Sequence, residues 1–349
     1  MDKKIVIKIG SSIFAPKGKI DNKVINNIVK NIVALEEKGK KIVLVSSGAI
    51  VSGIIALGHK KRLGDIHSLQ AYASLGQVIL MNLYAQKFKA YKKMCAQVLL
   101  TWDDFEDRER YLNARYTIEK LLKLGIIPII NENDTVSNEE IKFGDNDKLS
   151  ALVSNLISAQ LLLILSDVEG LLREDELVRL VDKIDDKIMN LAKREDSIFT
   201  TGGMVTKLEA ARIATKAGVK VVIADGRMKN VISKVMQGRG VGSLFLPHKT
   251  PQKAKKRWIA FSKKVKGRIF LDDGAKEAVL NKGKSILSCG ITKVEGYFFK
   301  KDAVEVLDVA GNVLGCGLVE YGSLELIDVK NKRFKREILH RDNFVKKEA

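Results

Sequence analysis

Short apolar segments alternate with longer amphipathic segments over the first 250 residues, and this alternation constrains the fold more than any other feature. The apolar segments are KIVIKIG at 4–10, KIVLVSSGAI at 41–50, AQVLLT at 96–101, GIIPIIN at 125–131, AQLLLILSD at 159–167 and GVKVVIADG at 218–226. Strands that are apolar on both faces and separated by helices indicate a three-layer α/β sandwich with a mainly parallel central sheet. Because ligands of such sheets bind beyond the carboxyl ends of the strands, a functional site is expected there.

The character of the chain changes after about residue 241. The segment LPHKTPQKAKKR at 246–257 contains two of the four prolines and a basic cluster, which is typical of a linker. Short segments separated by glycine turns follow, and they predict a small β-rich barrel. We therefore expect an α/β domain over residues 1–247, a linker over 248–256, a β-rich domain over 257–336 and a basic tail over 337–349.

The formal net charge is +19, and Lys and Arg are most in excess over the last hundred residues. A basic surface of this kind suits a polyanionic partner such as RNA. Solvated, lysine-rich faces would produce much of the same excess. The charge alone therefore leaves both interpretations open.

Several classes of protein are disfavoured by the sequence. No apolar run approaches the roughly 20 residues that span a bilayer, and the first residues lack a signal-peptide pattern, so we expect a cytoplasmic protein. The cysteines and histidines are scattered without the spacing of metal or redox sites. We therefore expect no metal site built from side chains and no histidine-dependent nucleophilic chemistry.

Polar loops rich in Gly, Ser, Asn and Asp follow the predicted strands, and they suit the binding of anions. They contain Lys8, Gly10, Ser47, Asn131–Asp134, Gly144–Lys148, Ser166 and Asp167. Each loop taken alone is also explained by turn and helix-cap preferences. Lys8 is the hardest to explain in this way, because it interrupts an apolar strand, where a lysine must be paired or desolvated.

The segment TTGGMVTK at 200–207 leads directly into a helical pattern. Its two adjacent glycines allow backbone N–H groups to approach an anion, Thr201 and Thr206 add hydroxyl donors, and Lys207 adds a charge near a helix N-terminus. The nucleotide-binding pattern GxxxxGK[ST] is absent from the chain. The segment therefore predicts a phosphate-binding loop of another kind, whereas a turn and a cap would explain it in isolation.

Taken together, these loops resemble those of the amino acid kinase family. The motifs that carry the resemblance, in the order of the family, are KIGSS at 8–12, SSGAIVSG at 46–53, EDRERYLNAR at 106–115, NENDTV at 131–136, FGDNDKLSA at 143–151 and TGGMVTKLEAA at 201–211. The combination of the last three is far more specific than a glycine motif. The segment 256–336 resembles the PUA domain that follows the kinase domain in some members.

The resemblance implies ATP-dependent phosphorylation of the side-chain carboxylate of L-glutamate to L-glutamyl 5-phosphate, the first step toward proline, with Mg²⁺ bridging the phosphates of ATP. The chemistry of the residues fits this reaction. A carboxylate with a pKa near 4.3 is already ionised at neutral pH and needs no general base. The site must instead supply positive charge and hydrogen-bond donors around the phosphoryl group.

The resemblance also implies roles for individual residues. Lys8 and Lys207 are expected to be catalytic residues that flank the phosphoryl group, and Asp147 is expected to orient their ammonium groups without taking a proton. For substrate binding, Ser47 and Asn146 are expected to donate to the carboxylates of L-glutamate, and Asp134 to accept from its α-ammonium group.

Binding of the nucleotide is assigned by the same resemblance to the loops after three strands. The expected nucleotide-binding residues are Lys8, Gly10, Ser166, Asp167, Thr201, Gly202, Gly203, Met204, Val205, Thr206 and Lys207. Among them, the three glycines are expected to donate their backbone N–H groups. Two nearby segments depart from the family pattern, GLLREDELVRL at 170–180 and Thr200–Gly203, and both departures concern the nucleotide site.

Two alternatives remain: another enzyme of the amino acid kinase fold, such as a uridylate or acetylglutamate kinase, and an RNA-binding protein that acts through its PUA domain. The motifs NENDTV and GDNDKLSA argue against the first, and the presence of Lys8, Asp147 and Lys207 argues against an inactive site. EDRERYLNAR is expected to form a solvated helix or a subunit contact. The resemblance further implies a homo-oligomer and feedback inhibition by L-proline, and RNA binding by the PUA domain remains open.

Overall fold

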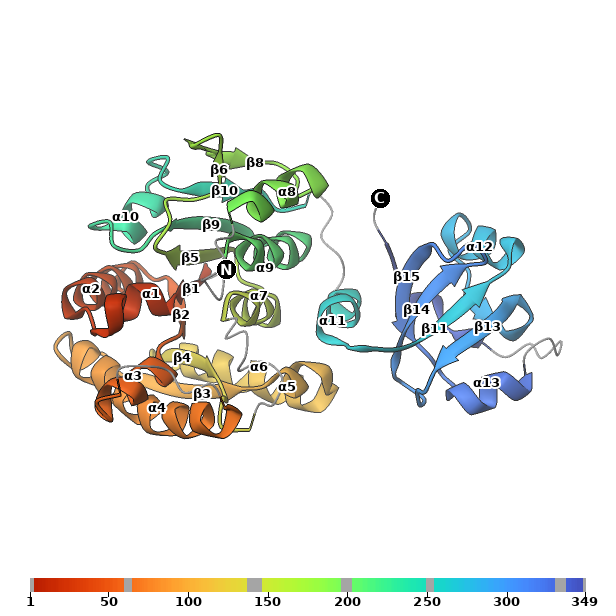
Figure 1. Ribbon diagram of the computed structural model, residues 1–349, viewed down its shortest axis with the longest axis horizontal. Coiled ribbons are helices and arrows are strands. Elements are labelled where there is room, and N and C mark those ends of the chain that lie inside the picture. The colour runs from red at the N-terminus through yellow and green to blue at the C-terminus, as the bar shows by residue number, and fades with distance from the viewer. Residues whose placement is uncertain are drawn as a thin grey trace. The chain divides into compact units, whose positions relative to one another are not determined.

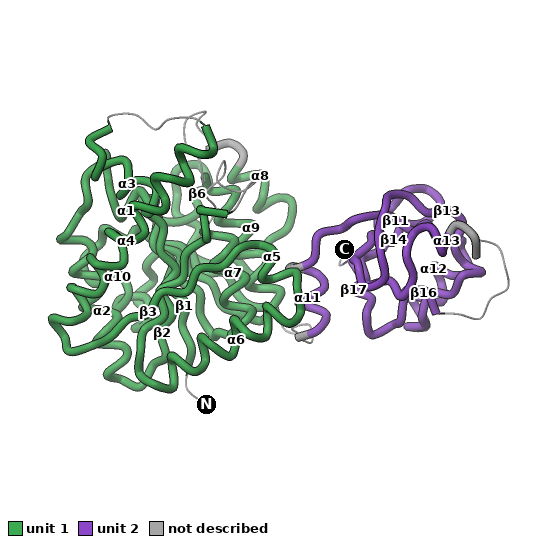
Figure 2. The backbone as a smooth tube through the Cα atoms, turned by 90° about the horizontal axis from the view of Figure 1, so that it is seen from below, with its two compact units in different colours: residues 1–251 green, residues 252–349 purple. Residues whose placement is uncertain are grey.

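The computed structural model describes residues 3–59, 65–136, 146–195, 203–248, 254–329 and 337–347. It divides into two compact units, Met1–Pro251 and Gln252–Ala349 (Figure 2). The division falls inside the segment expected to be a linker.

The first unit is built on one eight-stranded sheet with the order β3-β4-β2-β1-β5-β9-β10-β8. The strands are β1 (Lys4–Ile9), β2 (Lys41–Ser46), β3 (Cys95–Leu100), β4 (Ile127–Glu132), β5 (Leu161–Ser166), β8 (Leu180–Val181), β9 (Lys220–Asp225) and β10 (Ser243–Phe245). Every pairing is parallel except that of β10 with β9. The mainly parallel central sheet expected from the apolar segments is confirmed.

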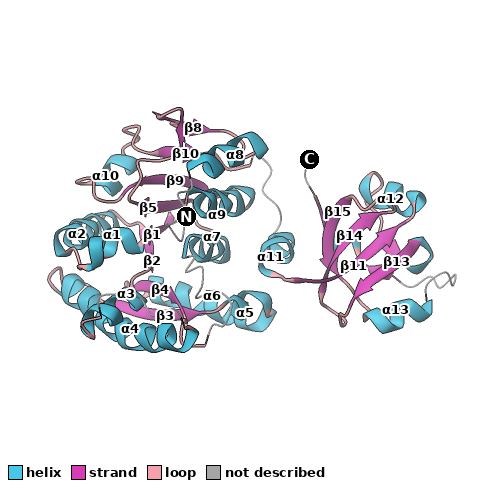
Figure 3. Cartoon of the chain, in the orientation of Figure 1, coloured by secondary structure: helices cyan, strands magenta, loops and turns pink. Residues whose placement is uncertain are grey.

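Helices cover both faces of this sheet (Figures 1 and 3). One face carries α2 (Asn22–Glu37), α4 (Ile66–Lys89) and α10 (Val231–Met236), and the other carries α6 (Arg108–Lys123), α7 (Asn146–Leu156) and α9 (Met204–Lys216). The remaining helices of the unit are α1 (Ser11–Phe14), α3 (Ala49–Ala56), α5 (Trp102–Glu106) and α8 (Asp186–Glu195). A short hairpin of β6 (Leu172–Arg173) and β7 (Glu176–Leu177) follows β5. The three-layer sandwich is confirmed.

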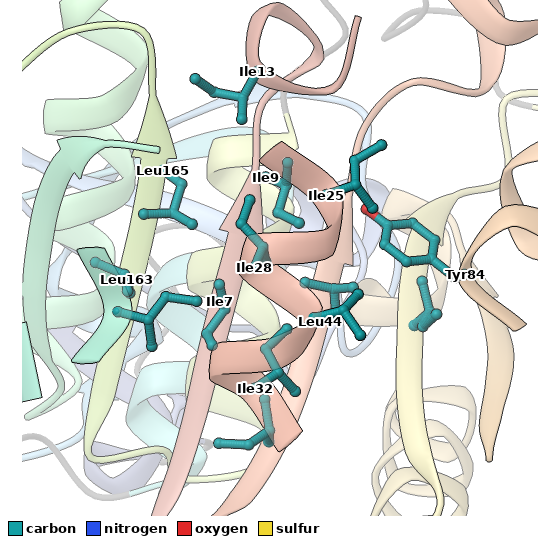
Figure 4. Packing of buried hydrophobic residues seen from close by; sticks show 14 of the residues in the cluster. Ile7, Ile9, Ile13, Ile25, Ile28, Ile32, Leu44, Tyr84, Leu163 and Leu165 are labelled. Atoms are coloured by element: carbon teal, nitrogen blue, oxygen red, sulfur yellow. The ribbon is translucent and has the colours of Figure 1, made fainter. Parts of the chain in front are cut away.

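Packing of the core decides which way the side chains of β1 point. Ile5, Ile7 and Ile9 belong to the buried cluster that β1 forms with α2 and α4, and Figure 4 shows Ile7 and Ile9 against the isoleucines of α2. Successive side chains of a strand alternate between faces. Lys8 therefore lies on the opposite face of the sheet, which α7 and α9 cover.

The second unit contains a five-stranded sheet with the order β13-β11-β14-β15-β17 and a two-stranded sheet of β12 and β16. Its strands are β11 (Val265–Leu271), β12 (Ile286–Leu287), β13 (Ile291–Gly296), β14 (Ala303–Asp308), β15 (Val313–Leu318), β16 (Glu337–Leu339) and β17 (Phe344–Lys346). Its helices are α11 (Ala254–Ser262), α12 (Asp273–Leu280) and α13 (Ser323–Val329). This unit is the expected β-rich domain, with its own hydrophobic core around Ile269 and Val306.

The expectation of a basic tail over residues 337–349 is wrong for most of that segment. Strand β17 pairs with β15, with Lys346 opposite Gly315, and β16 pairs with β12. Ile338 and Phe344 are buried in the core of the second unit. The apolar segments of this region are short and lie among basic residues, so the sequence alone did not indicate strands there.

Candidate active site

Three charged side chains meet beyond the carboxyl end of β1. Nζ of Lys8 lies 2.5 Å from Oδ1 of Asp147, and Nζ of Lys207 lies 3.4 Å from Oδ2 of the same carboxylate. The exposed fractions are 6%, 1% and 6% for Lys8, Asp147 and Lys207. The structure thus brings together the three residues expected to be catalytic, from β1, α7 and α9.

Asp147 is held in its ionised form by its neighbours. Burial raises the pKa of this carboxyl, but the charges of Lys8 and Lys207, together with hydrogen bonds from Lys8 and Thr206, outweigh burial and lower the pKa below its ordinary value. The Thr206 hydroxyl lies 3.1 Å from Oδ2. Asp147 also lies in the first turn of α7, where the helix dipole favours a negative charge.

The loop before α9 is described from Gly203 onward. Gly203 precedes the helix as its N-cap, and its carbonyl accepts hydrogen bonds from the Thr206 hydroxyl at 3.0 Å and from Lys207 Nζ at 3.5 Å. Met204 is buried, whereas Val205 and Thr206 are half-buried. Thr201 and Gly202, two of the expected nucleotide-binding residues, lie outside the described residues.

Gly10 lies next to Lys8, but its backbone N–H is already used. This N–H donates to the carbonyl of Leu165 at 3.1 Å, which ties the end of β1 to β5. A Cβ on Gly10 would lie 3.6 Å from Nζ of Lys8. The expectation that Gly10 supplies an N–H donor to phosphate is therefore corrected: its N–H joins the end of β1 to β5.

A cavity of about 390 Å³ has Asn146, the residue before Asp147, in its wall. Ser47, Asp134 and Asn146, the three residues expected to bind substrate, all line it. Its remaining lining residues come mainly from α1, α3 and the end of β4. Because Asn146 immediately precedes Asp147 in α7, the wall of the cavity and the charged cluster are continuous through the backbone.

Asn146 is tied to two strands by its side-chain nitrogen. Nδ2 lies 2.9 Å from Ser47 Oγ, 2.9 Å from Asn131 Oδ1 and 3.3 Å from the carbonyl oxygen of Ser46. These contacts join α7 to the ends of β2 and β4. They fix the position of the cavity wall relative to the sheet.

The loop after β5 holds the other residues expected to bind nucleotide. The Ser166 hydroxyl donates to Oδ1 of Asp167 at 3.1 Å. Arg227, which follows β9, donates to the backbone carbonyl of Asp167 at 2.7 Å and pairs with Asp225 at 2.9 Å. Ser166 and Asp167 thus lie at the same edge of the sheet as Lys8, at the end of the neighbouring strand.

Five residues in and around this site had no individual role assigned from the sequence. Arg227 supports Asp167, Asn131 and Gln77 support Asn146, and the hydroxyl of Ser46 lies 2.8 Å from that of Tyr84 in the core. Asn131 carried a signal, because it opens the motif NENDTV. Gln77 and Tyr84 carried none, because both lie within an ordinary amphipathic helix.

The side chains of this site suit a magnesium ion only if phosphates supply most of its ligands. Within the described ranges, no group of three or more His, Cys, Asp or Glu side chains could hold a metal ion. The charged cluster instead presents two ammonium groups, which suit phosphate oxygens rather than a cation. A magnesium ion at this site would therefore be held mainly by the phosphates of a nucleotide.

The described helices include none that is both long and apolar enough to cross a membrane.

The similarity of the chain to known proteins agrees with this geometry. Residues 3–225 match the model of the amino acid kinase family, and residues 267–340 match that of the PUA domain. A glutamate 5-kinase of Caldanaerobacter subterraneus subsp. tengcongensis is 41% identical, covering 98% of this chain and 97% of that protein. One from Dictyoglomus thermophilum is 42% identical with the same coverage.

A solved structure shares the fold of the first unit. Carbamate kinase from Giardia lamblia, bound to AMP-PNP, superimposes with a TM-score of 0.50 at 18% identity, and the match covers 71% of this chain and 99% of that one. At this identity the likeness concerns the fold alone. The family match over residues 3–225 and the relatives that align along nearly their whole length show that this chain belongs to the amino acid kinase family and carries a C-terminal PUA domain.

Proposed function

We propose that this chain is a glutamate 5-kinase, which transfers the γ-phosphoryl group of ATP to the side-chain carboxylate of L-glutamate and forms L-glutamyl 5-phosphate, the first step of proline biosynthesis. The observation that carries the proposal is the buried Lys8–Asp147–Lys207 cluster, which adjoins a cavity lined by Ser47, Asp134 and Asn146. The curated relatives, at about 41% identity, bear this enzyme's name.

The cluster suits the transfer of a phosphoryl group between two anions. The attacking carboxylate is ionised at neutral pH, so the site needs no general base. It needs positive charge that is fixed in place before the reaction, where the transferring group gains negative charge. Lys8 and Lys207 supply that charge from a buried position, where it is little screened by water.

Asp147 has a positioning role in this mechanism. Its lowered pKa keeps it ionised, so that it holds both ammonium groups by charge and takes no proton from them. Each of its oxygens faces a different lysine. The carboxylate therefore sets the distance between the two positive charges.

Nucleotide binding is proposed for the loop after β5 and for the residues around Gly203. Ser166, Asp167 and the start of α9 lie at the carboxyl edge of the sheet, where parallel sheets bind their ligands. The N-terminus of α9 offers backbone N–H groups and a favourable dipole to phosphate. A magnesium ion carried in with ATP would neutralise charge on its phosphates.

The substrate is proposed to lie in the cavity with its side-chain carboxylate toward the cluster. Uridylate and acetylglutamate kinases are less well supported, because the relatives aligned over nearly the whole chain are glutamate 5-kinases. The PUA domain is compatible with RNA binding, and a cytoplasmic location suits an enzyme of amino acid biosynthesis. Feedback inhibition by L-proline is proposed on family resemblance only.

A homo-oligomer is also proposed. Leu75 and Val78 of α4 and Met94, next to the edge strand β3, expose large apolar side chains on the first unit. Large apolar side chains exposed near an edge strand are typical of surfaces that pack against another chain. A monomeric mass in light scattering would contradict this proposal.

The activity is tested by ADP release from the purified full chain with Mg-ATP and L-glutamate, with hydroxylamine present to trap an acyl phosphate as the hydroxamate. Glutamate-dependent ADP release with formation of hydroxamate is the expected result. Turnover with uridylate or with another amino acid, and none with L-glutamate, would contradict the proposed substrate.

A further inference from the structure

A chain of four side-chain amides runs from the edge of the sheet to the substrate cavity. Gln97 of β3, Gln77 of α4, Asn131 of β4 and Asn146 of α7 are joined in this order by hydrogen bonds of 3.2, 2.9 and 2.9 Å. Asn131 and Asn146 are buried, Gln77 is half-buried and Gln97 is exposed. Four elements that are distant in sequence are thus connected by groups of one chemical type.

Two backbone groups decide which end of each amide is the oxygen. The Glu132 N–H can only donate, and it lies 2.9 Å from Oδ1 of Asn131. The carbonyl of Ser46 can only accept, and it lies 3.3 Å from Nδ2 of Asn146. Asn131 must therefore present its oxygen to Asn146 and its nitrogen to Gln77. It follows that Gln77 accepts through Oε1 and donates through Nε2 to Gln97.

The orientation of Asn146 determines what the cavity offers to a ligand. Its Nδ2 has three acceptors, from Ser46, Ser47 and Asn131, for two hydrogens. Its Oδ1 accepts no hydrogen bond from any residue in the described ranges. Since Asn146 lines the cavity, its amide offers an acceptor there and has no N–H to spare.

We propose that Gln77 is a positioning residue, which through Asn131 fixes Asn146 so that its Oδ1 accepts a hydrogen bond from the α-ammonium group of the substrate. This inference rests on the proposed function. It replaces the role of carboxylate donor expected for Asn146. Asp134 lines the same cavity, and a carboxylate together with an amide oxygen recognises an ammonium group by charge and by direction.

Loss of the Gln77 oxygen would leave Nδ2 of buried Asn131 without its acceptor. An unpaired buried donor is costly, so the Asn131 amide would move toward other acceptors and release Asn146. The positioning role therefore predicts a loss of discrimination for the ammonium group, rather than a loss of phosphoryl transfer. This separates Gln77 from Lys8 and Lys207.

The test compares Gln77→Met, which has similar length and no amide, with Gln77→Glu, which keeps an acceptor for Asn131. The measured quantity is the KM for L-glutamate relative to the inhibition constant of glutarate, which has the same two carboxylates and no ammonium group. Gln77→Met is expected to raise this ratio about tenfold, the effect of one lost hydrogen bond to a charged group, while kcat and the KM for ATP stay within about twofold. Gln77→Glu is expected to restore the ratio, and Asn82→Ala, at an exposed position of the same helix α4, to leave it unchanged.

An unchanged ratio in a folded Gln77→Met variant would overturn the positioning role. If that variant does not unfold cooperatively, Gln77→Ala replaces it, and failure of both to fold would make Gln77 a purely structural residue and overturn the inference as well. Absence of glutamate-dependent turnover in the unmodified chain would instead overturn the proposed function itself. Failure of the positioning role would be observed in the Gln77 variants, whereas failure of the proposed function would be observed in the unmodified chain.

Discussion

Nζ of Lys8, in the central strand β1, lies 2.5 Å from Oδ1 of Asp147, in helix α7, which covers one face of the sheet. Removing a lysine from water costs several kcal/mol unless a charge compensates it. Here the compensating carboxylate is shared with Lys207, so that three buried charges carry a net positive charge. Two ammonium groups held beside one carboxylate suit the phosphates of a nucleotide.

Lys8→Ala and Lys207→Ala are each expected to lower kcat by two or more orders of magnitude. Loss of a positive charge from the transition state corresponds to about 3 kcal/mol at a buried position. Steady-state kinetics with L-glutamate and ATP measure the effect. Lys4→Ala is the matched control for Lys8, because Lys4 lies at the other end of the same strand and pairs with Glu119. Near-normal turnover of either active-site variant would remove that lysine from the mechanism.

The site residues that could be predicted from the sequence are those that stand out within one short segment. Lys8 could be predicted as a site residue because a charge inside an apolar strand has few structural explanations. Asn146 and Asp147 could be predicted because they open a helix within a specific motif. The fold followed from apolar segments that alternate with helices. These features are local in the sequence, so they could be identified without the structure.

Features that depend on contacts between distant elements could not be predicted. Gln77 is one polar residue among several on α4, and only the folded sheet brings it to Asn131. The backbone N–H of Gly10 was expected to face phosphate, but the neighbouring strand takes it. The final strands were missed because their apolar runs are short and lie among basic residues.

Gly48→Ala is expected to destabilise the first unit and to raise the KM for L-glutamate. Gly48 has φ of 119°, which favours glycine, and a Cβ there would lie 2.6 Å from the ring of Phe14. Because Gly48 lines the cavity, movement to relieve this clash would displace the cavity wall. The expected loss in the free energy of unfolding is about 2 to 4 kcal/mol, from strain and overpacking together.

Gly125→Ala is the control for this substitution. Gly125 also has positive φ, 72°, but a Cβ there would meet no atom within 4 Å. Its cost is expected to be about 1 kcal/mol, the strain alone, without a change in KM. Equal losses of stability in the two variants, measured by urea denaturation, would show that the contact with Phe14 contributes nothing.

Arg227→Ala is expected to raise the KM for ATP about fivefold and to leave the KM for L-glutamate unchanged. Arg227 donates to the backbone carbonyl of Asp167 and so holds the loop proposed to bind nucleotide. The control is Arg268→Ala, because Arg268 also donates to an acceptor, the carboxylate of Glu305, but lies in the second unit. If Arg227→Ala raised the KM for L-glutamate more than the KM for ATP, the proposal that this loop binds nucleotide would be contradicted.

Asp308→Asn is expected to destabilise the second unit at neutral pH, with an effect that disappears in acid. The hydrogen bond from Lys276, at 2.8 Å, and those from the backbone N–H and side chain of Asn312 lower the pKa of Asp308 to about 2. The folded pKa lies below the ordinary value of 3.8, so the stabilisation is complete above pH 3.8 and is lost as the pH falls toward 2.

The fluorescence of Trp258, buried in α11 of the second unit, can follow this unfolding when Trp102, the other of the two tryptophans, is replaced by Phe. In that background, the free energy of unfolding of Asp308→Asn should approach that of the parent as the pH is lowered from 5 to about 2.5. Glu295→Gln, which removes a carboxylate from exposed ion pairs, should change stability little at any pH, since such pairs contribute little. A difference between Asp308→Asn and its parent that stays constant with pH would mean that Asp308 acts through its shape and not through its charge.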